Sequence, residues 1–178
     1  MQQPEPLACG LEARLARLEA LESIRALKAR YADLADRKYT PAYQRAAPQE
    51  MSRIARLQAE CFTPDAVWDG GSDFGSTRVG RDALAEWFEQ SPWCFALHFY
   101  DSPQIEVDPH AGRASAQWRL WQIALRDDTH EAVLLAAATS ESYALHDGRW
   151  LQSRMRFDQL HMLPVGDAPY PLRARLRS

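Results

Sequence analysis

The segment "RYADLADRKYT" at residues 30–40 places a phenol and two carboxylates, Tyr31, Asp33 and Asp36, where an apolar-periodic helix runs out. A carboxylate near a helix C-terminus faces the negative end of the macrodipole, so its ionised form is slightly disfavoured. A surface loop would absorb that cost in solvent, whereas a carboxylate beside a histidine in a pocket can take part in proton transfer. We assign Asp33 to the solvated helix face. For Asp36, the alternative is a capping role in the loop that follows the helix.

A histidine with suitable surroundings occurs in "WCFALHFYD", residues 93–101. Alternation in a strand would put His98 and Tyr100 on one face with the small residues Cys94 and Ala96, as in a cavity wall. The opposite face is interpreted as plain packing by Phe95, Leu97 and Phe99. A histidine titrates near neutrality, so it can accept a proton from carbon and return one to a leaving hydroxyl. The alternative is that His98 is a structural core histidine.

Other candidate lining residues come from three further strand patterns. Trp68 lies in "DAVWDGG" at residues 65–71, and "RASAQWRLWQIAL" at 113–125 contains Trp118 and Trp121. These two tryptophans have opposite parity, so they cannot both line one cavity unless a bulge intervenes. One is expected to face the pocket and the other to pack outward or against a partner. In "EAVLLAAATSESYAL", residues 131–145, one face has small side chains that would leave room inside a curved sheet: Ala132, Leu134, Ala136, Ala138, Ser140 and Ser142.

Helices must position the front half of this site. Apolar residues recur at steps of three and four from Leu11 to Leu34, which predicts a long amphipathic helix or two abutting helices. "QEMSRIARLQAECF" (49–62) predicts a second helix that ends before Thr63-Pro64, and "GRDALAEWFEQSP" (80–92) a third.

From residue 93 the period changes to two, and a fourth long strand candidate, "RWLQSRMRFDQLHML", covers 149–163. Helices followed by a meander favour an α+β fold, with a strongly bent antiparallel sheet around the helices. We expect one domain over residues 1–178. Residues 164–178 should form an extended tail on their own domain or on a neighbouring subunit.

Composition narrows the function classes. Apolar residues make up 46% and charged residues 25% of the 178-residue chain, as in ordinary globular proteins. The net charge of −3 gives no basic field for nucleic acid, and no apolar run reaches membrane-spanning length. The N-terminus lacks the order of a signal peptide, and three cysteines without a C-x-x-C pair predict a cytoplasmic protein.

A family resemblance rests on motifs that occur in order along residues 18–163. They are "LESIRALKARYADLADRKYT", "FTPDAVWDGG", "VGRDALAEWF", "LHFYDSPQIEVD", "GRASAQWRLW" and "DGRWLQSRMRFDQLHML". The set resembles the SnoaL-like branch of the nuclear-transport-factor-2-like superfamily, and in particular the scytalone dehydratase, bile-acid 7α-dehydratase and hexachlorocyclohexane dehydrochlorinase group. The resemblance implies a cone-shaped α+β barrel, with a pocket at its wide end.

The resemblance also implies site residues. Asp36 and His98 stand at the positions of that group's catalytic aspartate and histidine, and Tyr31 matches a tyrosine five residues before the aspartate. A further carboxylate on the next long strand has no counterpart in "QWRLWQ". An arginine on the last strand could correspond to Arg154 or Arg156. The substrate-binding candidates are therefore Tyr100, Trp118, Trp121, Trp68 and Arg154.

These types suit elimination of water beside an activating group, or a proton shift in a ring. Aspartate would orient the histidine, and Tyr31 would donate to an oxygen as enolate charge develops. Neither reaction needs a cofactor or metal, and "HEAVL" lacks the second histidine of a zinc protease motif. We predict a lyase (dehydratase) or isomerase for a small hydrophobic, ring-containing molecule such as a steroid or polyketide. The alternative is a non-catalytic binding or oligomerisation module. Surplus aromatics predict a homo-oligomer, dimer or trimer.

Overall fold

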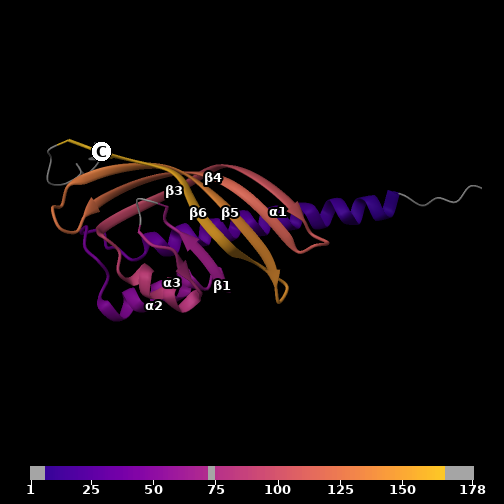
Figure 1. The fold of residues 1–178 in the computed structure, drawn as a ribbon, viewed down its shortest axis with the longest axis horizontal. Helices are drawn as coiled ribbons and strands as arrows, with labels where there is room; N and C mark the ends of the chain where they lie inside the picture. Colours follow the sequence, from indigo (N-terminus) through magenta and orange to yellow (C-terminus); the bar gives the residue numbers. More distant parts are fainter. Residues whose placement is uncertain (1–6, 72–74, 167–178) are drawn as a thin grey trace, which may run out of the picture.

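Three helices pack against one curved sheet in the computed structural model, which describes residues 7–71 and 75–166 (Figure 1). The predicted tail lies mostly outside the described residues, beyond residue 166. The helices are α1 (Leu7–Asp36), α2 (Pro48–Ala59) and α3 (Arg81–Glu89). The strands are β1 (Phe62–Asp69), β2 (Arg78–Val79), β3 (Trp93–Asp108), β4 (Arg113–Arg126), β5 (Ala132–His146) and β6 (Arg149–Pro164).

The sheet has the order β2-β1-β6-β5-β4-β3 and does not close into a barrel. The predicted α+β class and the curved sheet around N-terminal helices are confirmed. Neighbouring strands are antiparallel, except that β1 runs parallel to β6. The sequence carries no sign of this parallel pair, because β1 and β6 lie at opposite ends of the stranded part of the chain and a pairing between distant segments leaves no local pattern. It brings Trp68 on β1 opposite Met155 at the centre of β6.

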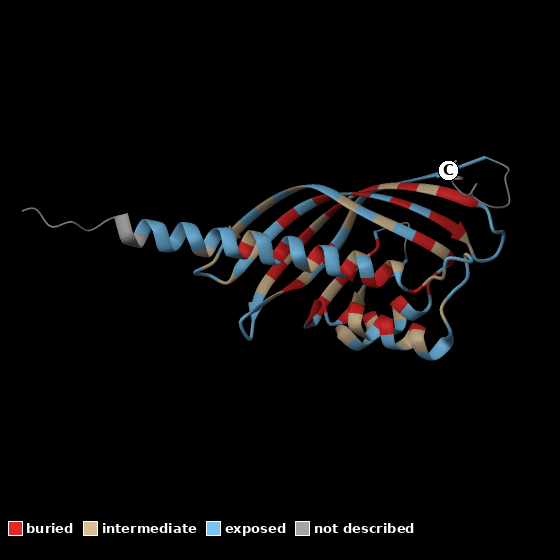
Figure 2. Ribbon diagram, turned by 180° about the vertical axis from the view of Figure 1, so that it is seen from behind, coloured by how far each residue is buried: buried red, intermediate tan, exposed pale blue. Residues whose placement is uncertain are grey.

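Helix α1 positions the first half of the site. Its C-terminal half lies along the concave face of the sheet, where Ile24, Tyr31 and Leu34 are buried. Its N-terminal turns extend beyond the sheet, and Leu11 and Leu15 remain exposed there (Figure 2). The apolar periodicity seen in the sequence therefore serves the core over only part of the helix. Packing fixes the end that contains Tyr31 and Asp36.

Helices α2 and α3 pack together below β1 and complete the core. Helix α2 ends at Ala59, three residues earlier than the sequence predicted, and Phe62 begins β1 instead. Phe62 is fully buried, and the residue before Pro64 is disfavoured in helical conformation, so the chain turns into the sheet here. The Tyr31 ring meets the rings of Phe62, Phe88 and Tyr100 edge-on, with centroids 5.7, 6.0 and 6.0 Å away. Such edge-on packing suits aromatic quadrupoles.

Strand β5 uses the opposite face from the one predicted. The buried residues that face the helices are Val133, Leu135, Ala137, Thr139, Glu141 and Tyr143. The predicted small face is partly exposed from Leu134 to Ser142 and belongs to the outer side of the sheet. Both faces of this strand carry apolar or small residues, so alternation alone gave no sign of which one is inside.

The expected packing face of β3 is likewise on the outer side. Leu97 and Phe99 are 37% and 54% exposed, whereas Phe95 packs against Tyr43. In register they lie opposite Ile123 and Trp121 of β4, which are also exposed. We call the patch formed by Leu97, Phe99, Trp121, Ile123 and Leu163 the apolar outer face. Among the described residues, no helix is long and apolar enough to cross a membrane.

Candidate active site

Asp36 and His98 meet at the end of α1. Asp36 Oδ1 lies 2.7 Å from His98 Nδ1 and also accepts a hydrogen bond from the His98 backbone N–H at 3.0 Å. The predicted contact between these side chains is therefore present. One carboxylate oxygen holds both the backbone and the ring of the same residue, so the position of the imidazole is fixed relative to α1.

The contact selects one tautomer of His98. A carboxylate can only accept a hydrogen bond, so Nδ1 carries the proton and the lone pair of the neutral ring sits on Nε2. Burial lowers the pKa of His98, and the hydrogen bond and charge of Asp36 oppose that shift. The neutral ring therefore predominates at neutral pH, with Nε2 available as a base.

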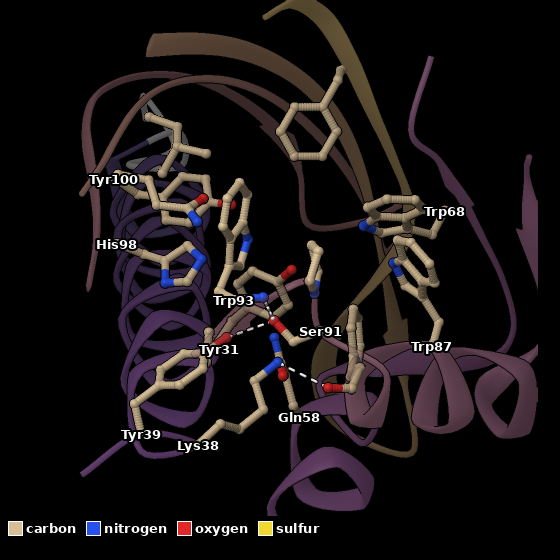
Figure 3. Close-up of a pocket in the computed structure, with 16 residues that line it drawn as sticks. Tyr31, Lys38, Tyr39, Gln58, Trp68, Trp87, Ser91, Trp93, His98 and Tyr100 are labelled. Carbon is tan, nitrogen blue, oxygen red and sulfur yellow. Dashed lines mark hydrogen bonds between the residues drawn. The ribbon is translucent and has the colours of Figure 1, made fainter. Parts of the chain in front are cut away.

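The His98 ring lines a pocket between the end of α1, the two short helices and the inner face of the sheet (Figure 3). The cavity has a volume of about 80 Å³ that water-sized molecules can occupy, and the hollow including its open mouth is about 560 Å³. The wall is mostly aromatic, formed by Tyr31, Tyr39, Trp68, Trp87, Phe88, Trp93, Tyr100 and Phe157. Small-molecule sites are commonly hollows of this kind, apolar with a few polar groups.

Two tyrosines place hydroxyl groups in or beside this pocket. Burial raises the pKa of Tyr31, against opposing hydrogen bonds from Gln58 and Trp68, and burial raises the pKa of Tyr100 well above its ordinary value. Both phenols are therefore neutral at physiological pH. They can donate hydrogen bonds to a substrate oxygen but cannot act as bases.

The pocket also contains polar residues that the sequence analysis did not identify. Lys38, Gln58 and Gln122 are 5%, 2% and 3% exposed, respectively, and all three line the hollow. Lys38 Nζ donates to the Phe88 carbonyl oxygen at 3.1 Å. Burial lowers the pKa of Lys38 to about 7, with Asp36 opposing the shift. A lysine just after a helix normally belongs to the solvated surface, so its sequence position gave no signal.

A buried ion pair lies next to the pocket and was also missed. Lys28 Nζ is 2.5 Å from Glu141 Oε1, and the two side chains are 2% and 0% exposed. Thr139 donates to the same carboxylate at 2.9 Å, and the Tyr143 hydroxyl donates to its other oxygen. The Lys28 ammonium lies 3.7 Å from the centre of the Tyr100 ring. The network thus supports one wall of the pocket from behind.

The remaining predicted residues do not all come together. Tyr31, Tyr100, Trp68 and His98 share the pocket lining. Trp118 is buried on the inner face but in a neighbouring cluster, where its indole N–H donates to Tyr143 at 3.0 Å.

Two predicted residues lie on the outer side of the sheet. Trp121 is 51% exposed, as the opposite parity of the two tryptophans required. Arg154 is half exposed and lies 3.8 Å from Asp69. Both are placed away from the pocket, because on a strand every second side chain points to the other face. Across the described residues, no group of three or more acidic, histidine or cysteine side chains is arranged to hold a metal ion.

A family model for the SnoaL-like domain matches residues 52–156. This chain belongs to the SnoaL-like domain family. The matched segment begins in α2 and contains His98 and nearly the whole sheet, whereas α1 with Asp36 precedes it. The SnoaL-like match therefore includes His98 but not Asp36, and the contact between the two residues is seen only in the structure.

Solved structures place the chain in the same nuclear-transport-factor-2-like fold. A hexachlorocyclohexane dehydrochlorinase (LinA type 2) is 15% identical, with a TM-score of 0.71 over 90% of this chain and 99% of that one. A LinA type 3 enzyme from Novosphingobium barchaimii LL02 is 18% identical, with a TM-score of 0.67 over 89% and 99%. A putative scytalone dehydratase from Novosphingobium aromaticivorans DSM 12444 is 15% identical, with a TM-score of 0.63 over 89% and 92%. At these identities the likeness concerns the fold. No curated protein sequence matches the chain.

Proposed function

We propose that this SnoaL-like protein is a cofactor-independent lyase, of dehydratase type, or an isomerase, with Asp36 and His98 as its acid–base pair. The observation that carries the proposal is the 2.7 Å contact between Asp36 Oδ1 and His98 Nδ1 at the wall of an aromatic pocket. A histidine that is buried, oriented by a carboxylate and open to a hollow has the arrangement that general base catalysis requires.

In the dehydration we propose, His98 Nε2 removes a proton from a substrate carbon next to a carbonyl group. The electrons of the broken C–H bond move toward the carbonyl, and negative charge develops on its oxygen. The imidazolium then gives its proton to the hydroxyl leaving group on the neighbouring carbon. The C–O bond breaks, a C=C bond forms and water departs. In an isomerase, the same proton would return to a different carbon.

Asp36 would stabilise the imidazolium during the reaction, because its charge lies beside the ring proton. Tyr31 and Tyr100, which are neutral at physiological pH, would donate hydrogen bonds to an oxygen of the substrate. The aromatic lining supports an apolar, ring-containing substrate. Among the structural neighbours, a hexachlorocyclohexane dehydrochlorinase and a putative scytalone dehydratase fit elimination chemistry in this fold.

We also propose that the apolar outer face is covered by a second copy of the chain, in a dimer or trimer. Paired in register across four strands, Phe99, Trp121, Ala136 and His161 form one row, and Leu97, Ile123, Leu134 and Leu163 form another. In a monomer these apolar side chains would be exposed to solvent, and exposed apolar patches commonly mark protein–protein interfaces.

Two variants with matched controls test the enzyme proposal. A thermal-shift screen of hydroxylated ring compounds identifies ligands, and turnover is then assayed on the hits. His98→Ala and Asp36→Ala should each lower kcat by roughly 10²–10⁴-fold, with little change in melting temperature. The controls Asp33→Ala and His110→Ala, which change exposed residues of the same types, should retain full activity.

The same experiment includes Tyr31→Phe, which removes a hydroxyl but keeps the packed ring. We expect a smaller loss of rate, on the order of tenfold, because one hydrogen-bond donor to the developing charge is lost. If ligands bind but the unmutated protein converts none of them, and His98→Ala binds them equally well, the protein is a binding module and the enzyme proposal is wrong.

A further inference from the structure

Lys38 has an unusual position for a lysine. Its side chain extends from the turn after α1 into the pocket, where Nζ reaches the Phe88 backbone oxygen (Figure 3). Within the described part of the chain, no carboxylate lies within ion-pair distance of Nζ. The closest acid in sequence, Asp36, is occupied with His98. An ammonium group has three donors, so Lys38 can donate to further acceptors.

A second donor faces the same hollow. Gln122 lies on β4 directly opposite His98 of β3, and its side chain points to the same face of the sheet. Its amide nitrogen is buried and has no hydrogen-bond partner among the described residues. Cross-strand neighbours of this kind have Cβ atoms about 5 Å apart, so a group bonded to Gln122 would also lie close to the imidazole.

Leaving such donors unmatched is costly. A buried polar group without a partner destabilises the fold unless water or a ligand satisfies it. A neutral apolar ligand would leave the Gln122 amide without a partner and Lys38 with the Phe88 oxygen as its acceptor. A ligand oxygen with full or partial negative charge would accept from both, and charge-assisted hydrogen bonds are the stronger kind.

We propose that Lys38 and Gln122 together bind a negatively polarised oxygen of the substrate, either a carboxylate or a carbonyl that becomes an enolate. This inference rests on the proposed function for the role of the oxygen in catalysis. The substrate class is thus an apolar ring compound with a carbonyl or carboxylate within a few bonds of the carbon that faces His98. An amide beside the histidine cannot exchange protons at neutral pH. Of this cross-strand pair, His98 is therefore the acid–base group, and Gln122 serves to position the oxygen.

Binding of three probes of similar size tests the proposal: benzoate, acetophenone and ethylbenzene. Calorimetry or ligand-observed NMR gives the dissociation constants for the unmutated protein, Lys38→Met and Gln122→Leu. Lys38→Met should weaken benzoate binding by about tenfold or more, acetophenone by a few fold, and ethylbenzene not at all. Gln122→Leu should follow the same order with smaller losses. Gln117→Leu, a change on the exposed face of the same strand, is the matched control and should leave all three constants unchanged.

A pH series separates a charge at Lys38 from a packing role. The charged groups that influence the pKa of Lys38 are Asp36 and Arg45, and the titratable groups that line the same pocket are Tyr39, His98, Tyr31 and Tyr100. His98 titrates below its ordinary pKa, and burial raises the pKa of Tyr39 to about 12, so neither changes charge just above neutrality. Benzoate affinity should therefore fall as pH rises above 7 while Lys38 loses its proton. Lys38→Met should bind benzoate weakly and independently of pH over the same range.

The outcomes distinguish this inference from the proposed function. If His98→Ala abolishes turnover, or if no turnover is ever found, the preference for benzoate over ethylbenzene should still depend on Lys38. Tighter binding of benzoate than of acetophenone identifies a carboxylate as the ligand, and the reverse identifies a carbonyl. The inference is overturned if neither oxygen-bearing probe binds the unmutated protein better than ethylbenzene, including the case in which none of them binds. Equal losses for all three probes in Lys38→Met also overturn it. Thermal unfolding of each variant verifies that it is folded.

Discussion

Breaking the buried Lys28–Glu141 pair should cost far more than removing it entirely. In Lys28→Met, the carboxylate of Glu141 stays in a site that is 0% exposed and loses its only counter-ion among the described residues, although Thr139 and Tyr143 still donate to it. Removing one partner of a buried pair typically destabilises a protein by about 3–5 kcal/mol. The two remaining donors place our expectation near the lower end, about 3 kcal/mol. For a domain of this size that corresponds to a fall of roughly 6–12 °C in melting temperature.

The double variant Lys28→Met/Glu141→Gln decides whether the cost comes from the unpaired charge. Neither charge is then present, and the amide oxygen introduced at position 141 would still accept from one of the neighbouring hydroxyls. We expect the double variant to recover about 2 kcal/mol relative to Lys28→Met, because replacing both members of a buried pair is often close to neutral.

Urea denaturation followed by tryptophan fluorescence measures these free energies of unfolding. As a control, Glu50→Gln breaks the exposed Arg53–Glu50 pair, whose side chains are half exposed, and should leave the denaturation midpoint unchanged. The single variant Glu141→Gln completes the comparison. If the double variant loses the sum of the losses in Lys28→Met and in Glu141→Gln, Lys28 and Glu141 do not interact in the folded protein and the reasoning fails.

Two further predictions concern pH and assembly. Burial lowers the pKa of Lys38 to about 7 in the folded protein, whereas its ordinary value is 10.5, so between these values the unfolded chain binds more protons and stability should rise with pH. The free energy of unfolding from urea denaturation should therefore rise by on the order of a few kcal/mol between pH 7 and 10, and Lys38→Met should remove this rise. The opposite slope would contradict the burial of this lysine. Sedimentation should show a dimer or trimer at micromolar concentration, and Trp121→Glu, which puts a charge on the apolar outer face, should give a folded monomer. A monomeric unmutated protein would contradict the assembly proposal.

Sequence patterns were informative where one periodicity dominated. The change of apolar period after residue 92 predicted helices followed by a meander, and the structure has that order. The ordered motifs located Asp36 and His98, which are 62 residues apart yet lie in contact. Opposite parity separated Trp118 from Trp121, because strand alternation is a local property of the backbone. The order of elements and the parity of the two tryptophans depend on neighbouring residues along the chain, so the sequence by itself determined them, whereas the contact between Asp36 and His98 is made by the fold.

The tertiary structure decided which faces and which charges are inside. On β5, Leu134 and Leu135 are equally apolar, and only packing against the helices selects Leu135 for the core. Lys28, Lys38 and Glu141 each look like surface residues in sequence. Lys28 and Glu141 lie 113 positions apart, and each can be buried only because the other neutralises it. The burial of Lys38 depends on the short helices that cover the end of α1. Burial of a charge is a property of its surroundings in space, and those surroundings exist only once the distant segments have come together.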